Sequence, residues 1–248
     1  MRYAICIYGY LRSYQFTIYN FIKQLVKPYG CDVFIYCPNT TYAKLDDDIF
    51  HTKANPELVH PHRIKDDFGL YLKSIATWSY DKHIFIDKVK KDGVVKKNKF
   101  NQETWRSYSM FFHIKRVLEM MESYEMQMNI KYDKVILTRL DLFIYNKVKL
   151  KKLSNEIVYF PIGEGFDEEN KRRFGAAPID KTDKTLNDQF LIGNRDHIIK
   201  LKDIYDNIKD FVHKNKIELN NETLIGYQFI QNNIQFEPKD IILYKLYR

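Results

Sequence analysis

The chain has 248 residues, of which 45% are hydrophobic and 29% are charged, which excludes an intrinsically disordered protein and predicts a globular one. Its formal net charge is 40 − 32 = +8, which favours an anionic partner but is equally typical of a lysine-rich solubilising surface. The three cysteines include no CxxC pair, which argues against a zinc site and favours reduced thiols in the cytoplasm.

The sequence also bears on whether the protein contacts membranes or nucleic acids. No apolar run approaches the roughly 18 residues of a membrane-spanning helix, and the first residues do not resemble a signal peptide. We therefore expect a cytoplasmic protein without a transmembrane segment, although its basic surface would allow peripheral association with a membrane. Nucleic acid is not an expected partner, because the lysine cluster at 88–99 lacks interleaved aromatic residues and no DNA- or RNA-binding signature occurs.

The N-terminal part of the chain predicts a strand, a helix and a second strand. Tyr3 to Tyr8 form a continuous apolar run, as in a strand that is buried on both faces. Gly9 to Arg12 predict a loop, and apolar residues at helical spacing predict an amphipathic helix over about residues 14–28. A second buried strand follows at 31–37. This order predicts a parallel crossover unit.

Residues 38–100 carry weaker patterns, for which we expect loops, short helices and a strand. An apolar run lies at 83–86, and Asp92-Gly93 predicts the turn of a hairpin. The aspartate triplet at 45–49 and the two histidines at 60–62 contain metal-ligand residue types. A solvated loop is the better interpretation of the triplet, and the histidines have no third partner nearby.

The remaining chain returns to strong patterns. A long helix is expected within 101–128, and a mobile loop from 163 to about 187. Another short helix is expected over 220–233, with Asn221 as its cap. We also expect a helix over 198–212, strands at 132–139, 157–161 and 189–194, and strands near the C-terminus. Strands alternating with helices predict one α/β domain, with a mostly parallel central sheet flanked by helices.

Polar residues at the ends of predicted strands are candidates for a site, because ligands of open α/β sheets bind beyond the carboxyl ends of the strands. Gly9 lets the backbone approach a ligand, and Arg12 can pair bidentately with phosphate, although a tight turn with a surface arginine is the alternative. The turn matches neither the dinucleotide-binding pattern nor the P-loop. Asp188 could act as a general base or bind a hydroxyl-rich acceptor, with a cap as the alternative.

Two charged residues interrupt the apolar sequence DKVILTRLDLFIY at 133–145. Asp141 could bind a divalent ion that bridges two phosphates, and Arg139 could serve the same phosphates or hold the carboxylate. A structural ion pair is the alternative. By the alternation of an extended chain, Leu140 and Leu142 should point into the core, while Arg139 and Asp141 share a ligand-facing side where they need not be buried.

Five short motifs in sequence order carry a resemblance to a known family. They are YGYLR at 8–12, DVFI at 32–35, YDKVILTRLDL at 132–142, NDQFLIG at 187–193 and NETLIGY at 221–227. In this order they resemble motifs of small GT-A-fold glycosyltransferases and glycosyltransferase-like proteins of large DNA viruses and of bacterial capsule or lipopolysaccharide loci.

The resemblance implies a fold and an activity. The chain 1–248 would form a single GT-A-like, Rossmann-like domain, with a nucleotide-sugar-binding half at about 1–140 and an acceptor-side half at about 141–248. It would transfer a sugar, by this analogy a hexose, from a UDP- or GDP-sugar to a hydroxyl of a glycan or glycoconjugate acceptor. In a virus, the expected location would be the host cytoplasm.

The resemblance also implies roles for individual residues. Four residues would bind the nucleotide-sugar: Gly9, Arg12, Arg139 and Asp141. Asp141 stands where the family's DxD motif holds Mn²⁺ or Mg²⁺, but Arg139 replaces the first aspartate. Asp141 could therefore bind the metal alone, or Arg139 could neutralise the diphosphate without metal; either device stabilises the leaving group. Asp188 would be the catalytic base in an inverting reaction, with Glu222 as the second choice.

Two other functions are compatible with the sequence. A catalytically inactive GT-A-like protein that binds nucleotides or glycans would account for the missing first aspartate. A basic protein associated with nucleic acid is the less favoured alternative, and it predicts binding to DNA or RNA that falls steeply with salt.

Overall fold

The computed structural model describes residues 1–41, 57–98, 101–150, 153–161, 178–179 and 184–246. Seven of its strands form one sheet: β1 Tyr3–Tyr8, β2 Asp32–Pro38, β3 Leu72–Trp78, β4 Lys134–Thr138, β6 Ile157–Pro161, β9 Phe190–Asn194 and β10 Gln235–Lys239. Two smaller sheets pair β5 Leu142–Ile144 with β11 Tyr244–Leu246 and β7 Pro178–Ile179 with β8 Lys184–Thr185.

The helices are α1 Tyr14–Phe21, α2 Lys27–Tyr29, α3 Pro61–Phe68, α4 Lys82–Asp92, α5 Trp105–Met128, α6 Arg195–Ile198, α7 Ile204–His213 and α8 Asn221–Gln231. A π-helical turn at Ile22–Val26 joins α1 to α2, and short 3-10 turns lie at Gly69–Tyr71 and Ile199–Asp203. None of these helices is long and apolar enough to cross a membrane, within the part of the chain that the structure describes.

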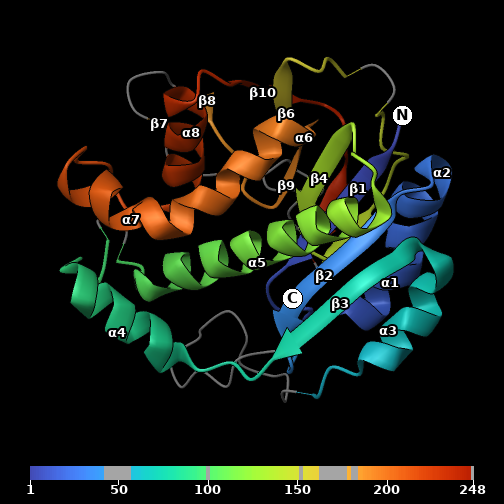
Figure 1. Cartoon of the computed structure of the whole chain (residues 1–248), viewed down its shortest axis with the longest axis horizontal. Coiled ribbons are helices and arrows are strands. Elements are labelled where there is room, and N and C mark those ends of the chain that lie inside the picture. The colour runs from blue at the N-terminus through green and yellow to red at the C-terminus, as the bar shows by residue number, and fades with distance from the viewer. Residues whose placement is uncertain (42–56, 99–100, 151–152, 162–177, 180–183, 247–248) are drawn as a thin grey trace.

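Helices cover both faces of the large sheet, so the central strands β1, β2 and β4 are buried on both faces. In Figure 1, α5 lies across the front of the sheet, while α1 and α3 lie behind it. Ala4, Cys6 and Tyr8 enter the core under α5, and the alternate residues Tyr3, Ile5 and Ile7 enter the core under α1 and α3. The expected fold class, α/β with a mostly parallel sheet flanked by helices, is confirmed.

The order and direction of the strands bring several chain segments to the carboxyl ends of the parallel strands. The order is β10-β6-β9-β4-β1-β2-β3, so the chain runs from β1 outward to β3 and then returns to the other side of β1. The sheet is parallel except for β9, which runs antiparallel to β4 with Phe190 opposite Thr138. The start of β9 therefore lies beside the carboxyl ends of β1 and β4.

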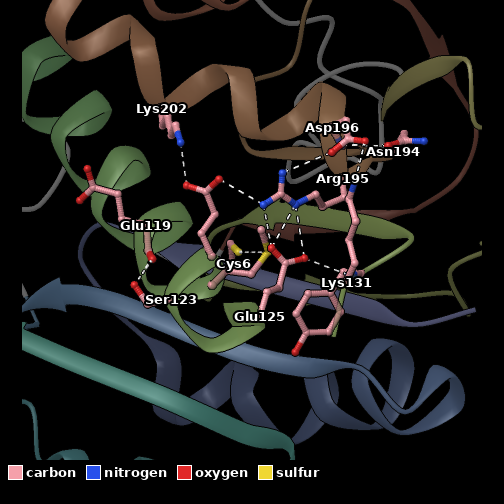
Figure 2. A network of polar contacts seen from close by, with 12 residues as sticks. Cys6, Glu119, Ser123, Glu125, Lys131, Asn194, Arg195, Asp196 and Lys202 are labelled. Atoms are coloured by element: carbon pink, nitrogen blue, oxygen red, sulfur yellow. Dashed lines mark hydrogen bonds and ion pairs between the residues drawn. The ribbon is translucent and has the colours of Figure 1, made fainter. Parts of the chain in front are cut away.

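An ion-pair network joins α5 to α6 near the start of β4, at the opposite ends of the strands from Arg12 (Figure 2). Arg195, the first residue of α6, donates from Nη2 to Glu125 Oε2 at 2.7 Å and pairs with Glu122 at 3.1 Å. Glu125 also accepts a hydrogen bond of 2.9 Å from the backbone N–H of Tyr132, just before β4. Lys202 completes the network by pairing with Glu122 at 2.7 Å. The network fixes the end of α5 against the start of β4.

The expected hairpin at Asp92-Gly93 is wrong. The apolar run at 83–86 lies within α4, and Asp92 and Gly93 are the last residue and the C-cap of the same helix. Gly93 has a φ of +68° and is the left-handed C-cap of α4, a conformation that glycine adopts in helix ends as readily as in hairpin turns. Phe85 and Val89, four residues apart, are the apolar positions that α4 buries.

The strand expected somewhere within 38–100 is β3, which the sequence did not locate. It is an edge strand whose seven residues are all half-buried, so it lacks the apolar run that marks the central strands. The rings of His60 and His62 lie 5.6 Å apart at the start of α3. The aspartate triplet at 45–49 lies outside the described residues, as do residues 163–177 and 180–183 of the expected loop.

Candidate functional site

The first segment of the candidate site is the turn after β1. Gly9 has a φ of +80°, and a Cβ there would meet no atom within 4 Å, so glycine is required by the backbone conformation rather than by space. Arg12 has a φ of +44°, a left-handed conformation that costs a non-glycine residue about 1 kcal/mol or more. Its backbone N–H donates to the carbonyl of Thr41 at 3.0 Å. The turn holds Arg12 just beyond the carboxyl end of β1.

The second segment follows β4 and contains a buried ion pair. Arg139 Nε donates to Asp141 Oδ1 at 2.9 Å, and Arg139 Nη2 donates to Oδ2, so the pair is bidentate. Arg12 Nη1 approaches the same Oδ2 at 3.4 Å. The Asp141 side chain has no exposed area, and that of Arg139 is 18% exposed. Leu140 is also fully buried, as expected.

The expectation that the two charges need not be buried is therefore wrong for Asp141. Alternation along the chain places a side chain on a face, but it does not reveal that two arginines cover that face. Burial alone would lower the pKa of Arg139, but the carboxylates of Asp141 and Asp188 raise it above its ordinary value. Arg139 thus remains charged at any pH at which the protein is folded.

Tyr8, the last residue of β1, links this strand to the segment that precedes β9. Its hydroxyl donates to the backbone carbonyl of Asp188 at 2.6 Å. Burial raises the pKa of Tyr8 well above its ordinary value. Four charged side chains act on this hydroxyl through space: Asp188, Arg139, Asp141 and Glu222. These electrostatic interactions link Tyr8 to residues up to 214 positions away in the sequence, 222 − 8.

The third segment, which precedes β9, is held in place by hydrogen bonds on both sides of Asp188. Asn187 Nδ2 donates to the hydroxyl of Tyr244 at 2.6 Å, and that hydroxyl donates to Gln189 Oε1 at 2.9 Å. Asn187 Oδ1 accepts from the Gln189 backbone N–H at 2.8 Å. Thr138 Oγ1 donates to the Gln189 carbonyl at 3.0 Å. The capping role expected as an alternative thus falls to Asn187, while Asp188 is half-buried at the site.

The fourth segment is the start of α8, where the expected cap is displaced by one residue. Asn220, not Asn221, is the N-cap, and its Oδ1 accepts from the backbone N–H groups of Glu222 at 3.0 Å and Thr223 at 3.2 Å. The Asn221 side chain is then available for another contact, and its Nδ2 donates to Asp188 Oδ2 at 3.3 Å. The start of α8 therefore supports Asp188.

The side chains around Asp141 do not fit a divalent cation. Both of its oxygens are engaged by guanidinium groups, whose positive charges would repel a metal ion. Among the described residues, no group of three or more histidine, cysteine, aspartate or glutamate side chains has the arrangement of a metal site. Of the two devices implied by the resemblance, the arginine device fits the observed contacts better.

An aromatic cluster adjoins the turn after β1. The ring of Tyr10 lies 5.1 Å from that of Tyr80, and Tyr80 lies 5.5 Å from Trp78. Trp78 Nε1 donates to His113 Nε2 at 3.1 Å, so that nitrogen carries no proton, and His113 Nδ1 donates to the carbonyl of Ser109 at 2.6 Å. Burial lowers the pKa of His113 to about 4, so the histidine is neutral.

The sequence did not identify every residue of the site. Tyr8 ends an apolar strand and begins the YGYLR motif, but neither pattern indicates a role for its hydroxyl in the site. Tyr244 lies far along the chain in an apolar segment, so no local pattern indicates that it contacts Asn187 and Gln189. Asn220 and Asn221 are adjacent and of the same residue type, so the sequence does not distinguish which of them is the cap.

The sequence matches no model of a known protein family, and no curated protein matches it significantly. Any function assigned to the chain therefore rests on the chemistry of these four segments.

Proposed function

We propose that this protein is a nucleotide-sugar-dependent glycosyltransferase with a GT-A-like domain. One observation carries the proposal: a pair of arginines and a set of carboxylates converge where the chain order of the sheet reverses, beyond the carboxyl ends of β1 and β4. In open α/β sheets this is the position at which nucleotides bind. Arginines suit a diphosphate, and carboxylates suit hydroxyl-bearing sugars.

The arginines would bind the diphosphate of a UDP- or GDP-sugar. The ion pair with Asp141 uses Nε and Nη2 of Arg139, two of the five N–H donors of a guanidinium. Arg12, Arg139 and Asp141 together carry a net charge of +1, since two cations face one anion. This charge would stabilise the nucleoside diphosphate as it leaves, when negative charge grows on its phosphate oxygens.

Asp188 would accept the proton of the acceptor in an inverting reaction. The acceptor hydroxyl oxygen forms the new bond to the anomeric carbon, the bond from that carbon to the phosphate oxygen breaks, and the leaving diphosphate takes the electron pair. The hydroxyl proton passes to Asp188, whose backbone and side chain are held by Tyr8 and Asn221. Glu222 is the second candidate, since its charge also acts on the Tyr8 hydroxyl.

Binding is tested by thermal shift with UDP- and GDP-sugars, with Mn²⁺ and with a chelator. A nucleotide-sugar at about a hundredfold excess over its Kd should stabilise the protein by about 3 kcal/mol, whether or not metal is present. Arg139→Lys, which keeps the charge but loses the bidentate geometry, should weaken binding about tenfold or more. Arg116→Lys is the matched control, because Arg116 is exposed on α5, where it pairs with Glu119 and lies over the ring of Tyr36. Folded protein that responds to no nucleotide would contradict the proposal.

Catalysis is tested by measuring sugar transfer or donor hydrolysis. Asp188→Asn should reduce kcat by about 10²- to 10⁴-fold with little change in nucleotide affinity. If Asp188→Asn remains fully active while Glu222→Gln is inactive, the base is Glu222 and the assignment of Asp188 is wrong.

A second function is favoured by the contacts of Asp141. Because two arginines engage this carboxylate, the protein could bind a nucleotide or glycan without transferring the sugar. Nucleotide-dependent stabilisation, together with no hydrolysis and no transfer to a broad panel of acceptors, would support this inactive binding protein.

A further inference from the structure

The exposed side of α1 and α2 carries aromatic residues and lysines that the candidate site does not use. Phe16 and Tyr19 are 72% and 76% exposed, and Lys23 and Lys27 are also exposed. These four residues are spaced by three, four and four positions through a continuous helical segment that includes the π turn. The spacing places them along one side of the helix.

The chain from Ile144 to Leu150 lies alongside this helix. Asn20 on α1 exchanges two hydrogen bonds with the backbone of Ile144, at 2.9 and 2.7 Å. Tyr29 on α2 hydrogen-bonds to the backbone at Val148 and Leu150. The two segments therefore lie side by side from Asn20, near the end of α1, to Tyr29, at the end of α2.

The neighbouring segment adds to the same surface. Its residues alternate, with Val148 and Leu150 buried and Tyr145, Lys147 and Lys149 exposed. We call the resulting surface the basic aromatic face, which consists of Phe16, Tyr19, Lys23, Lys27, Tyr145, Lys147 and Lys149. Aromatic residues gather at its α1 end and lysines at its α2 end.

The basic aromatic face is cationic because of its local sequence. Neither residues 13–31 nor residues 142–150 contain an aspartate or glutamate, although acidic residues make up 32 of the 248 positions in the chain. The four lysines are thus not neutralised by acidic residues of their own segments. Elsewhere, exposed lysines such as Lys90, Lys131 and Lys214 pair with nearby carboxylates.

We propose that the basic aromatic face docks on an anionic lipid bilayer. Lysines attract acidic headgroups, and exposed phenylalanine and tyrosine rings enter the boundary between headgroups and acyl chains. A single-stranded nucleic acid fits less well, because its backbone and bases call for cations and rings interleaved along one groove. Here the rings and the lysines occupy separate ends of the face. The proposal is independent of the reaction at the candidate site.

Sedimentation with lipid vesicles tests the proposal. The whole chain should bind vesicles that contain phosphatidylglycerol, bind phosphatidylcholine vesicles far less, and be released by high salt. Each lysine is expected to contribute about fivefold to the affinity. The quadruple variant Lys23→Glu, Lys27→Glu, Lys147→Glu and Lys149→Glu should therefore reduce binding by about a hundredfold or more. Phe16→Ser with Tyr19→Ser should reduce it by about tenfold.

A second quadruple variant controls for overall charge. It replaces with glutamate four exposed lysines on or beside α4 and α7, toward the opposite end of the molecule (Figure 1): Lys91, Lys96, Lys200 and Lys209. Both variants lower the formal net charge from +8 to 0, since each reversal removes two units. The control should retain most vesicle binding.

Three outcomes would overturn the proposal. The first is no binding to anionic vesicles by folded wild-type protein, checked by circular dichroism. The second is equal loss of binding in both quadruple variants. The third is that duplex DNA binds, or a dimer forms, through the basic aromatic face while vesicles do not.

Discussion

Asp141 shows how a residue expected to bind a ligand can instead fix the residues that we propose bind it. Its carboxylate is fully buried between Arg139 and Arg12, so it sets the position of both guanidinium groups. A buried ion pair contributes little net stability when compared with an apolar core, but removing one partner leaves an uncompensated charge. Asp141 therefore affects both the stability of the fold and the chemistry of the site.

Asp141→Asn should lower the free energy of unfolding by about 3 kcal/mol, because it leaves Arg139 without its carboxylate. Urea denaturation measures this loss. The matched control is Asp206→Asn, which removes an exposed carboxylate paired with Lys115 and should cost less than about 1 kcal/mol. Equal effects in the two variants would contradict the buried pair. If Asp141 instead held a metal, Mn²⁺-dependent nucleotide binding should disappear in Asp141→Asn.

We expect His113 to make the free energy of unfolding depend on pH. Its folded-state pKa of about 4 lies below the ordinary value of 6.5, so the unfolded chain takes up the proton first as the pH falls. The contribution of neutral His113 to the free energy of unfolding is fully present above pH 6.5 and is lost as the pH falls toward 4. At about pH 5 the loss is about 2 kcal/mol. Urea denaturation above pH 6.5 and at about pH 5 measures this loss. His113→Gln should remove it, because glutamine can keep the contacts to Trp78 and Ser109 without titrating. An unchanged pH profile in this variant would rule out His113 as the cause.

At the scale of elements, α5 is held by charges at its C-terminal end and by apolar packing along its length. Arg195 and Glu125 are 15% and 6% exposed, which makes their ion pair much less solvated than the nearby pair of Lys131 with Asp196. Burial alone would lower the pKa of Arg195, but its hydrogen bonds to Glu125 raise it above its ordinary value. This pair links the end of one helix, the start of another and the start of β4.

Arg195→Met should lower the free energy of unfolding by about 3 kcal/mol, because it leaves Glu125 buried without its cation. Lys131→Met removes a cation from the same network at an exposed position and should change stability by less than about 0.5 kcal/mol. Chemical denaturation of both variants gives the comparison. Similar small effects in the two would show that solvent screens Glu125.

The sequence predicted elements best where a segment showed a single clear pattern, either a continuous apolar run or helical spacing of apolar residues. The central strands β1, β2 and β4 and the helix α5 have continuous apolar runs or strong helical spacing, and the structure contains all of them. Asp92-Gly93 was assigned to a hairpin because glycine at positive φ serves both hairpin turns and helix ends. The direction of β9 was not predictable, since the alternation of its side chains is the same in parallel and antiparallel pairing.

At the scale of the whole molecule, the sequence placed the site residues at strand ends, but the site depends on the order of the strands. The strand order reverses at β1, and β9 runs antiparallel to β4. Together these two features bring Arg12, Arg139 and Asp188 to the carboxyl ends of β1 and β4, and neither feature follows from local patterns. The burial of Asp141 was also not predictable, because it results from contacts between segments 129 residues apart. The contact of Tyr244 with Asn187 is nonlocal in the same way.

The aromatic cluster gives the protein a built-in optical reporter. Trp78 is one of only two tryptophans in the chain, and ring contacts connect it through Tyr80 to Tyr10, which lies between Gly9 and Arg12. A ligand that moves this turn will change the surroundings of the Trp78 indole and hence its emission. In a Trp105→Phe variant, the remaining fluorescence would come from Trp78 alone. Ligands could then be screened by titration without a label and without knowledge of the acceptor.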